Sequence, residues 1–212
     1  MRICCISDTH RSEHLVEIPK CDLLLHAGDF DLYDLNDCEI LNRYFGIWKE
    51  KAKNIVFCAG NHDFYCQKIH PNFIQEVINN AIYLQDSSVT INGLKIYASP
   101  WSPIFGNWAF MLPGDELKKK WEQISKDTDI LLTHAPPYGI LDNVLRANGD
   151  LGENVGCPHL RDKVKEIQPK LHVFGHIHGS YGKYTDYKTN YINASLMNEA
   201  YELANKPIIL EI

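Results

Sequence analysis

Five short segments of the sequence carry the carboxylate, amide and imidazole side chains that bind divalent metal ions. In chain order they are Asp8-Thr9-His10, Gly28-Asp29, Gly60-Asn61-His62-Asp63, His134 and Gly175-His176-Ile177-His178. Together they hold five of the ten histidines of the chain. A donor set of nitrogen and oxygen without thiolate suits manganese, iron, zinc or magnesium. We therefore predict a metal centre assembled from distant parts of the chain.

The spacing within two of these segments supports a shared cavity. Asp8 and His10 are two residues apart, as are His176 and His178. Alternate residues of an extended segment face the same way, so each pair can present two ligands to one cavity. Glycines at positions 28, 60 and 175 would let the backbone turn sharply or approach an ion closely.

Two ions are favoured over one, because Asp29 is a carboxylate that can bridge them. Three further donors then remain for each ion. We assign one ion to Asp8, His10 and His178, and the other to Asn61, His134 and His176.

A pair of ions about 3.5 to 4 Å apart would support phosphoester hydrolysis. The ions lower the pKa of a bridging water, so that a hydroxide attacks phosphorus near neutral pH, and they neutralise the phosphoryl oxygens. His62 is not needed as a ligand. We predict that it donates a proton to the leaving alkoxide as general acid, with Asp63 orienting its imidazole.

The elements that must position these residues can be read from the apolar pattern. Buried strands are predicted at Arg2–Ile6, Leu23–His26, Ile55–Cys58, Ile130–Thr133 and Leu171–Phe174. Helical spacing between them predicts helices at Asp37–Lys51, Pro71–Asn80, Asp115–Lys126 and Pro158–Gln168. The class is therefore α/β, in which the carboxyl ends of parallel strands converge on one crevice.

A second sheet is predicted from a different pattern. Asn92-Gly93 between alternating apolar residues over 88–98 is a strong hairpin signal. Tyr184–Asn193 and Pro207–Ile212 are similarly strand-like. We expect a second, more antiparallel sheet to pack on the first, with helices flanking both.

Bulk properties limit the class of protein. The 212 residues, 45% of them hydrophobic, fit one domain over 1–212. A net charge of -6 argues against binding of extended nucleic acid through its phosphates. Neither a signal peptide nor a membrane-length apolar run is present, so we expect a cytoplasmic location, no membrane and a small phosphoester substrate. The seven cysteines have no disulfide-scaffold spacing and are expected to be reduced thiols, with Cys4, Cys5, Cys58 and Cys66 as small buried hydrophobic residues.

In order and residue type, the five segments resemble the calcineurin-like metallophosphoesterase superfamily. Further segments resemble its metallophosphoesterase-domain-containing branch of class III phosphodiesterases: Leu25-His26-Ala27-Gly28-Asp29, Ile82-Tyr83-Leu84-Gln85-Asp86, Ser99-Pro100-Trp101, Thr133-His134-Ala135-Pro136-Pro137, Gly156-Cys157 and Leu171-His172-Val173-Phe174-Gly175-His176. The resemblance implies a four-layer α/β/β/α sandwich of two mixed sheets, two divalent metals and phosphodiester hydrolysis. Cyclic nucleotides are one candidate substrate, and manganese is the first metal to test. The branch commonly has Glu where this chain has Asp63, which would loosen the orientation of His62.

Two other functions are weighed against this one. A phosphoesterase-like scaffold that binds partner proteins should lack metal ligands or the acid, and all of them are present here. A Ser/Thr or small-molecule phosphomonoesterase is the second alternative. The Ser/Thr phosphatases carry Asp-Arg-Gly after the second segment to bind phosphate, whereas Phe30, Asp31 and Leu32 follow Asp29 here.

Several residues outside the five segments have two interpretations. Trp101 and Trp108 would either pack in the interior or form an aromatic wall of the pocket. His26 and His172 lie in apolar runs and are expected in the core or behind the metal ligands. The segment 142–156, with Asn143, Arg146, Asn148 and Asn154, is either a rim of the pocket or a surface loop.

Overall fold

Two sheets packed face to face form the centre of the computed structural model, which describes residues 1–146 and 149–212. The first sheet contains, in spatial order, β15 (Ile208–Glu211), β1 (Arg2–Ile6), β2 (Cys21–His26), β3 (Ala52–Phe57) and β4 (Ile82–Tyr83). The second contains β13 (Gly182–Thr185), β14 (Asn190–Asn193), β12 (Leu171–Phe174), β9 (Ile130–Thr133), β6 (Leu94–Ser99) and β5 (Ser87–Ile91).

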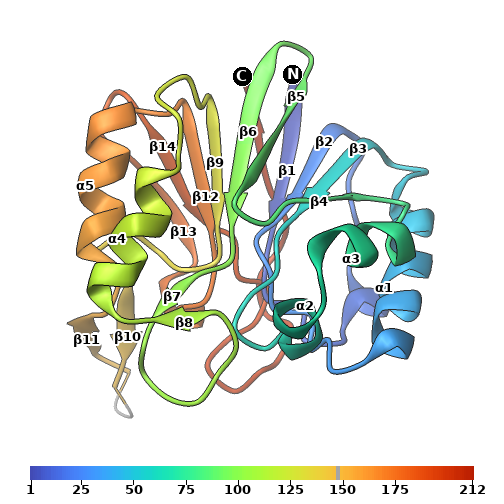
Figure 1. Cartoon of the computed structure of the whole chain (residues 1–212), viewed down its shortest axis with the longest axis horizontal. Coiled ribbons are helices and arrows are strands. Elements are labelled where there is room, and N and C mark those ends of the chain that lie inside the picture. The colour runs from blue at the N-terminus through green and yellow to red at the C-terminus, as the bar shows by residue number, and fades with distance from the viewer. Residues whose placement is uncertain (147–148) are drawn as a thin grey trace.

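Helices cover the outer face of each sheet (Figure 1). Those beside the first sheet are α1 (Leu35–Trp48), α2 (Phe64–Lys68) and α3 (Pro71–Val77), and those beside the second are α4 (Gly114–Glu122) and α5 (Pro158–Ile167). The predicted four-layer α/β/β/α sandwich is therefore confirmed.

The apolar runs of the sequence are explained by burial on both faces of each sheet. In β1, Ile3 and Cys5 face the core between the two sheets, whereas Cys4 and Ile6 face the core that packs against α1. A strand covered on both sides needs an apolar residue at every position, and a continuous run results instead of an alternating one.

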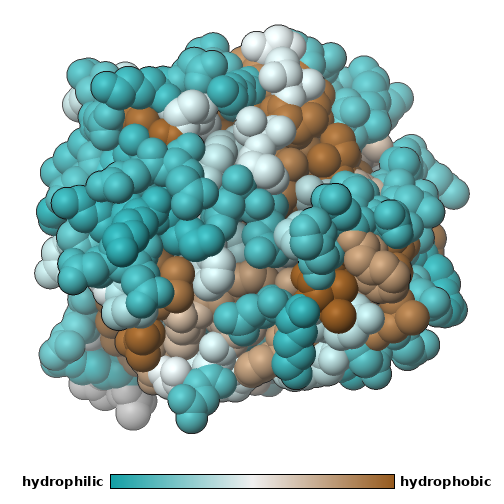
Figure 2. Space-filling view, in the orientation of Figure 1, coloured by the Kyte–Doolittle hydropathy of each residue, from teal (hydrophilic) through white to brown (hydrophobic). Residues whose placement is uncertain are grey.

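A third core lies between the second sheet and its helices. Leu117 and Trp121 of α4 pack with Leu160 of α5 against Leu131 of β9. Figure 2 shows that the outward surfaces of α4 and α5 are hydrophilic, so each helix buries one stripe only. All seven cysteines are free, as expected, and Cys21, Cys38 and Cys157 are buried as well as the four that we predicted.

The predicted hairpin is confirmed at Asn92-Gly93. β5 and β6 pair antiparallel with Ile91 opposite Leu94. Asn92 has φ 50° and Gly93 has φ 81°, the positive values that a tight two-residue hairpin turn requires.

One strand lies in a different sheet from the one that we predicted. β15 pairs antiparallel with β1, with Ile209 opposite Cys4, and so belongs to the first sheet. Without it, the outer edge of β1 would expose unpaired backbone groups. The second sheet is correspondingly mixed, because β6, β9, β12 and β14 run parallel to one another.

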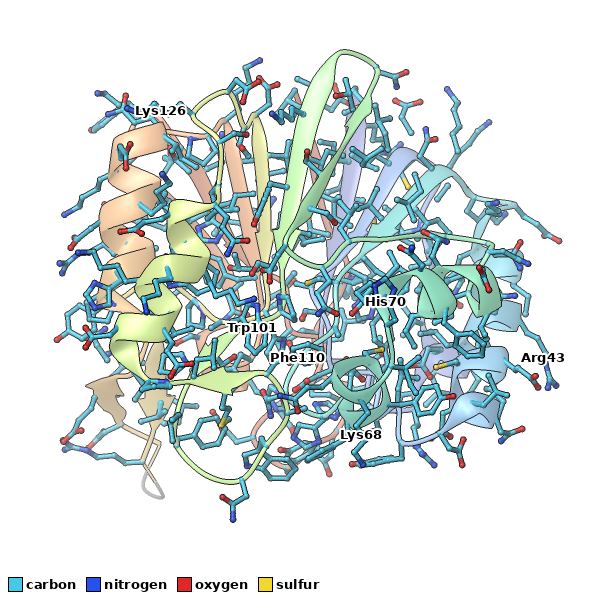
Figure 3. All side chains as sticks on the ribbon, viewed as in Figure 1. Arg43, Lys68, His70, Trp101, Phe110 and Lys126 are labelled. Atoms are coloured by element: carbon cyan, nitrogen blue, oxygen red, sulfur yellow. The ribbon has the colours of Figure 1, made fainter. Side chains whose placement is uncertain are left out.

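A polar contact ties the segment after β6 to α4. Asp86 accepts hydrogen bonds from Trp101 Nε1 at 2.8 Å and from Lys120 Nζ at 2.7 Å. Trp101 also packs edge-on against Phe110, and both lie near the middle of the molecule in Figure 3. Among the described residues, no helix is both long enough and apolar enough to cross a bilayer.

Candidate metal centre

The five predicted segments meet at one end of the sandwich. They follow β1, β2, β3, β9 and β12, whose carboxyl ends point toward the lower half of Figure 1. Four of the residues have left-handed backbone conformations: φ is 54° at Asp8, 42° at His10, 61° at Asp29 and 71° at His176. Such conformations are costly for residues other than glycine and cluster at functional sites.

The first group of ligand atoms comes from Asp8, His10 and His178, which lie within 4.8 Å of one another. His178 Nδ1 donates to the carbonyl of Asn198 at 3.0 Å. Its Nε2 therefore faces Asp8 Oδ1, at 3.6 Å. His10 Nε2 is buried and has no hydrogen-bond partner in the described part of the structure. An orphaned imidazole nitrogen beside a carboxylate is what a metal site requires.

The second group comes from Asp29, His134 and His176, again within 4.8 Å of one another. His134 Nδ1 donates to the carbonyl of Ala27 at 2.8 Å. This contact directs His134 Nε2 toward Asn61 Oδ1 at 2.8 Å and Asp29 Oδ2 at 3.3 Å. A backbone carbonyl that holds the far nitrogen of a histidine is the usual support of a metal ligand.

Asp29 lies between the two groups. Its Oδ2 is 3.3 Å from His134 Nε2 in one group and 3.8 Å from His10 Nε2 in the other. His10, Asp29 and His62 form a third set of ligand atoms within 4.8 Å. The geometry thus brings together all seven side chains that we predicted as ligands.

The carboxylates give the cluster its charge distribution. Burial would raise the pKa of Asp29, but the adjacent His134 and His10 outweigh it and lower the pKa to about 2. Burial would likewise lower the pKa of His10 and of His134, yet their carboxylate neighbours raise both to about 9. Burial dominates at His176 and lowers its pKa to about 3. Cations would replace the protons that the metal-free cluster holds on His10 and His134.

Glycine is required where the segments approach the cluster. A Cβ on Gly60 would lie 2.3 Å from Asp29 Oδ1, and one on Gly175 would lie 2.1 Å from Asp8 Oδ2. Both distances are shorter than any real contact of this type, so a side chain would displace these carboxylates. The glycines leave the space that the sequence pattern predicted.

The carboxylate that contacts the His62 ring is that of Asp31, and not that of Asp63 as predicted. His62 Nδ1 lies 2.9 Å from Asp31 Oδ1, and His10 Nδ1 lies 3.3 Å from the same oxygen. The Asp63 carboxylate instead accepts hydrogen bonds from the backbone N–H groups of Asp29, Phe30, Leu32 and Gly60. The Asp63 carboxylate therefore holds the backbone segments that follow β2 and β3.

A cavity of about 530 Å³ opens over the cluster. Asp29, Asn61, His62, His176 and His178 line it, together with the following residues of the surrounding loops: Pro103, Ile104, Phe105, Trp108, Val144, Val155, Ile177, Glu199 and Tyr201.

Of Trp101 and Trp108, only Trp108 lies at this cavity. The Trp108 ring stacks on His62 with 4.3 Å between ring centroids, whereas Trp101 belongs to the contact with Asp86. The segment 142–156 does reach the rim, through Val144 in β10 (Asn143–Leu145) and Val155, which follows the antiparallel partner strand β11 (Leu151–Asn154). Asn148 lies outside the described residues.

His26 and His172 lie in the interior, as expected. His26 Nδ1 accepts from the N–H of Gly28 at 3.2 Å, and its Nε2 lies 3.2 Å from Thr9 Oγ1. His172 Nε2 lies 2.8 Å from Thr133 Oγ1.

Residues near the carboxyl terminus complete the centre, and sequence reasoning missed them. Tyr201 has its ring 4.8 Å from that of His10 and 5.0 Å from that of His178. Asn198 supplies the carbonyl that holds His178. Neither residue follows one of the five apolar runs, so no signal in the sequence marks them; Asp31 could have been suggested by its place two residues after Asp29.

Comparison with known proteins gives consistent matches. Residues 1–180 match the family model described as calcineurin-like phosphoesterase. The chain is 39% identical over 236 residues to metallophosphoesterase domain-containing protein 1 of Homo sapiens, covering 100% of this chain and 71% of that protein. It is 34% identical over 247 residues to UPF0046 protein T07D4.2 of Caenorhabditis elegans, covering 100% of this chain and 60% of that protein. A crystal structure that is 12% identical superposes with a TM-score of 0.65 over 91% of this chain and 89% of the other, a likeness of fold alone.

Proposed function

Because the chain belongs to the calcineurin-like phosphoesterase family, whose members are metal-dependent hydrolases, we propose that it hydrolyses phosphodiesters with two divalent ions. The proposed ligands of one ion are Asp8, His10 and His178, those of the other are Asn61, His134 and His176, and Asp29 would be shared. The two groups of ligand atoms on either side of Asp29 support this division. Their nitrogen and oxygen donors suit manganese.

We prefer a diester substrate because the described lining of the cavity has no cationic side chain. That lining contains carboxylates, imidazoles and apolar groups, but no Lys or Arg. A monoester brings a second negative charge, which is usually met by Arg or Lys. A diester has one negative charge, and the ions alone can offset it.

Individual side chains would have distinct roles in this reaction. Ions bound by these residues would supply an activated water and would neutralise the phosphoryl oxygens. Asp31 holds Nδ1 of His62, which leaves Nε2 of His62 to donate a proton to the leaving alkoxide. Trp108 covers one face of the His62 ring, so the ring is restrained as well as oriented.

We also propose that residues 1–212 act as one metallophosphoesterase domain. The family match ends at residue 180, but β13, β14 and β15 lie beyond it and complete both sheets. Asn198 and Tyr201, which contact the metal cluster, lie there too.

The test is turnover of bis(p-nitrophenyl) phosphate after manganese loading. We expect the metal to stimulate hydrolysis of this ester. For an alkyl diester, whose alkoxide leaving group needs a proton, His62→Ala should lower kcat by roughly 10² to 10⁴, the usual contribution of a general acid. His14→Ala, which changes an exposed histidine outside the cavity, should leave kcat unaltered. A panel of cyclic nucleotides, linear diesters and monoesters then ranks substrates. Metal-loaded protein that hydrolyses none of them would refute the proposal.

A further inference from the structure

One side of the cavity is lined by aromatic and carboxylate side chains that phosphodiester hydrolysis does not need. Beyond the metal cluster, the rings of Phe105, Trp108 and Tyr201 line the space together with the carboxylate of Glu199. These three aromatic residues are 59%, 39% and 55% exposed, respectively, so much of their apolar surface is open to solvent. Exposed apolar groups around a concave site indicate contact with a ligand.

The Glu199 carboxylate is held at this rim without a cationic partner. Its Oε1 accepts a hydrogen bond from the N–H of Gly179 at 2.9 Å, and none of the ion pairs between described residues involves Glu199. A Cβ on Gly179 would lie 2.7 Å from that oxygen, so the carboxylate packs closely on the glycine backbone. Gly179 directly follows His178, which places the negative charge beside the metal cluster.

The rings are fixed around the same space. Tyr201 packs edge-on against His10 and His178, and Trp108 stacks on His62. Aromatic faces attract a cation that approaches within about 6 Å of the ring, and combinations of such rings recognise quaternary ammonium groups. A nearby carboxylate adds direct charge attraction.

We propose that this rim binds an alkylammonium group, and that the substrate is a phosphodiester carrying such a group on one of its ester arms. The inference rests on the proposed function, because the phosphate is taken to lie at the metal cluster. A zwitterionic diester places its phosphate against cations and its ammonium against Glu199. A substrate with a second anionic group would instead set like charges together. A flat neutral group could stack on the rings but would leave Glu199 unpaired.

Binding can be tested independently of catalysis. Choline and its uncharged isostere 3,3-dimethylbutanol are titrated into the full chain after metal removal, with tryptophan fluorescence as the readout because Trp108 lines the cavity. We expect choline to bind at least about 10-fold more tightly than the isostere. Glu199→Gln keeps the acceptor for Gly179 and should remove that advantage, whereas Glu76→Gln, an exposed site on α3, should not. Equal binding of the two compounds would overturn the proposal.

Turnover gives the second test. p-Nitrophenyl phosphorylcholine and 3,3-dimethylbutyl p-nitrophenyl phosphate share a leaving group and differ only in the charge of the other arm. We expect kcat/KM to favour the choline ester by about 10-fold in the wild type and the ratio to fall to about one in Glu199→Gln. A ratio that Glu199→Gln does not change would overturn the role of Glu199. If no diester at all is hydrolysed, the proposed function fails, and the choline titration still decides whether the rim binds ammonium.

Discussion

Two pairs of buried histidines in this protein have pKa values that are shifted in opposite directions. His10 and His134 belong to the metal cluster, and their side chains are 4% and 0% exposed. His26 and His172 lie in the interior, and both are fully buried. Burial lowers the pKa of His26 and of His172 to about 3, whereas the pKa of His10 and of His134 is raised to about 9.

The difference comes from direct contact with a carboxylate: Asp31 contacts His10 and Asp29 contacts His134, whereas Asp8 and Asp29 act on His26 without such a contact and do not outweigh its burial. His172 has an unpartnered buried ring nitrogen, just as His10 has, but no charged group contributes to its pKa. Asp29, Asp8 and Asp31 act on His10 and outweigh the cost of burial. An orphaned imidazole nitrogen therefore marks a cation site only where carboxylates converge on it, because a buried charge needs compensation.

The largest expected effect comes from removing the charge shared by the two ligand groups. Asp29→Asn should release at least one ion per chain and lower kcat for bis(p-nitrophenyl) phosphate by at least about 10³, since several kcal/mol of charge stabilisation is lost. Metal content by atomic emission and steady-state kinetics measure both. His172→Gln changes an interior histidine and should retain the metal. Full metal content and activity in Asp29→Asn would show that the two groups do not share this carboxylate.

A smaller effect is expected at Asp31, which touches cluster residues without belonging to either ligand group. Asp31→Asn should lower kcat by about 10- to 100-fold, the usual cost of losing a group that orients a ligand or acid. Asp37→Asn, which removes the partner of Arg11 at the surface, is the matched control and should keep kcat near wild type. An unchanged kcat in Asp31→Asn would mean that the contact with His62 has no role in proton donation.

The smallest effect concerns stability and pH in the metal-free protein. The pKa of His10 and of His134 rises from 6.5 in the unfolded chain to about 9 in the fold. The protonated forms therefore stabilise the fold fully below pH 6.5, and this contribution is lost as pH rises through 9. Melting in EDTA should show Tm falling by several degrees over this window, at roughly 2 to 4 °C per kcal/mol.

The comparison predicts which variants alter this profile. In the fold, His26 and His172 have a pKa of about 3 and stay neutral, so His172→Gln should keep the slope above about pH 7.5, where these histidines are also neutral in the unfolded chain. Asp29→Asn should flatten the dependence of Tm on pH. Manganese should reverse it, because deprotonated imidazoles bind metal and apparent affinity rises with pH. A flat Tm in metal-free wild-type protein would contradict the assigned charge states.

The sequence by itself determined the strands that carry the centre and the seven side chains that meet there. A strand buried on both faces must be apolar throughout, so β1, β9 and β12 were predicted with the bounds that the structure has. Polar residues directly after such strands have to lie at their carboxyl ends. Local pattern and backbone geometry are sufficient for that inference.

Only the tertiary structure decided which neighbours support these side chains. Asp31 and Asp63 are both carboxylates near a predicted ligand, and nothing in the local sequence says which one reaches His62. The answer depends on how the chain after β2 packs against the chain after β3, where four backbone N–H groups occupy Asp63. Tyr201 and Glu199 reach the cavity for a similar reason: the path of a loop is set by distant packing, which no short-range periodicity encodes.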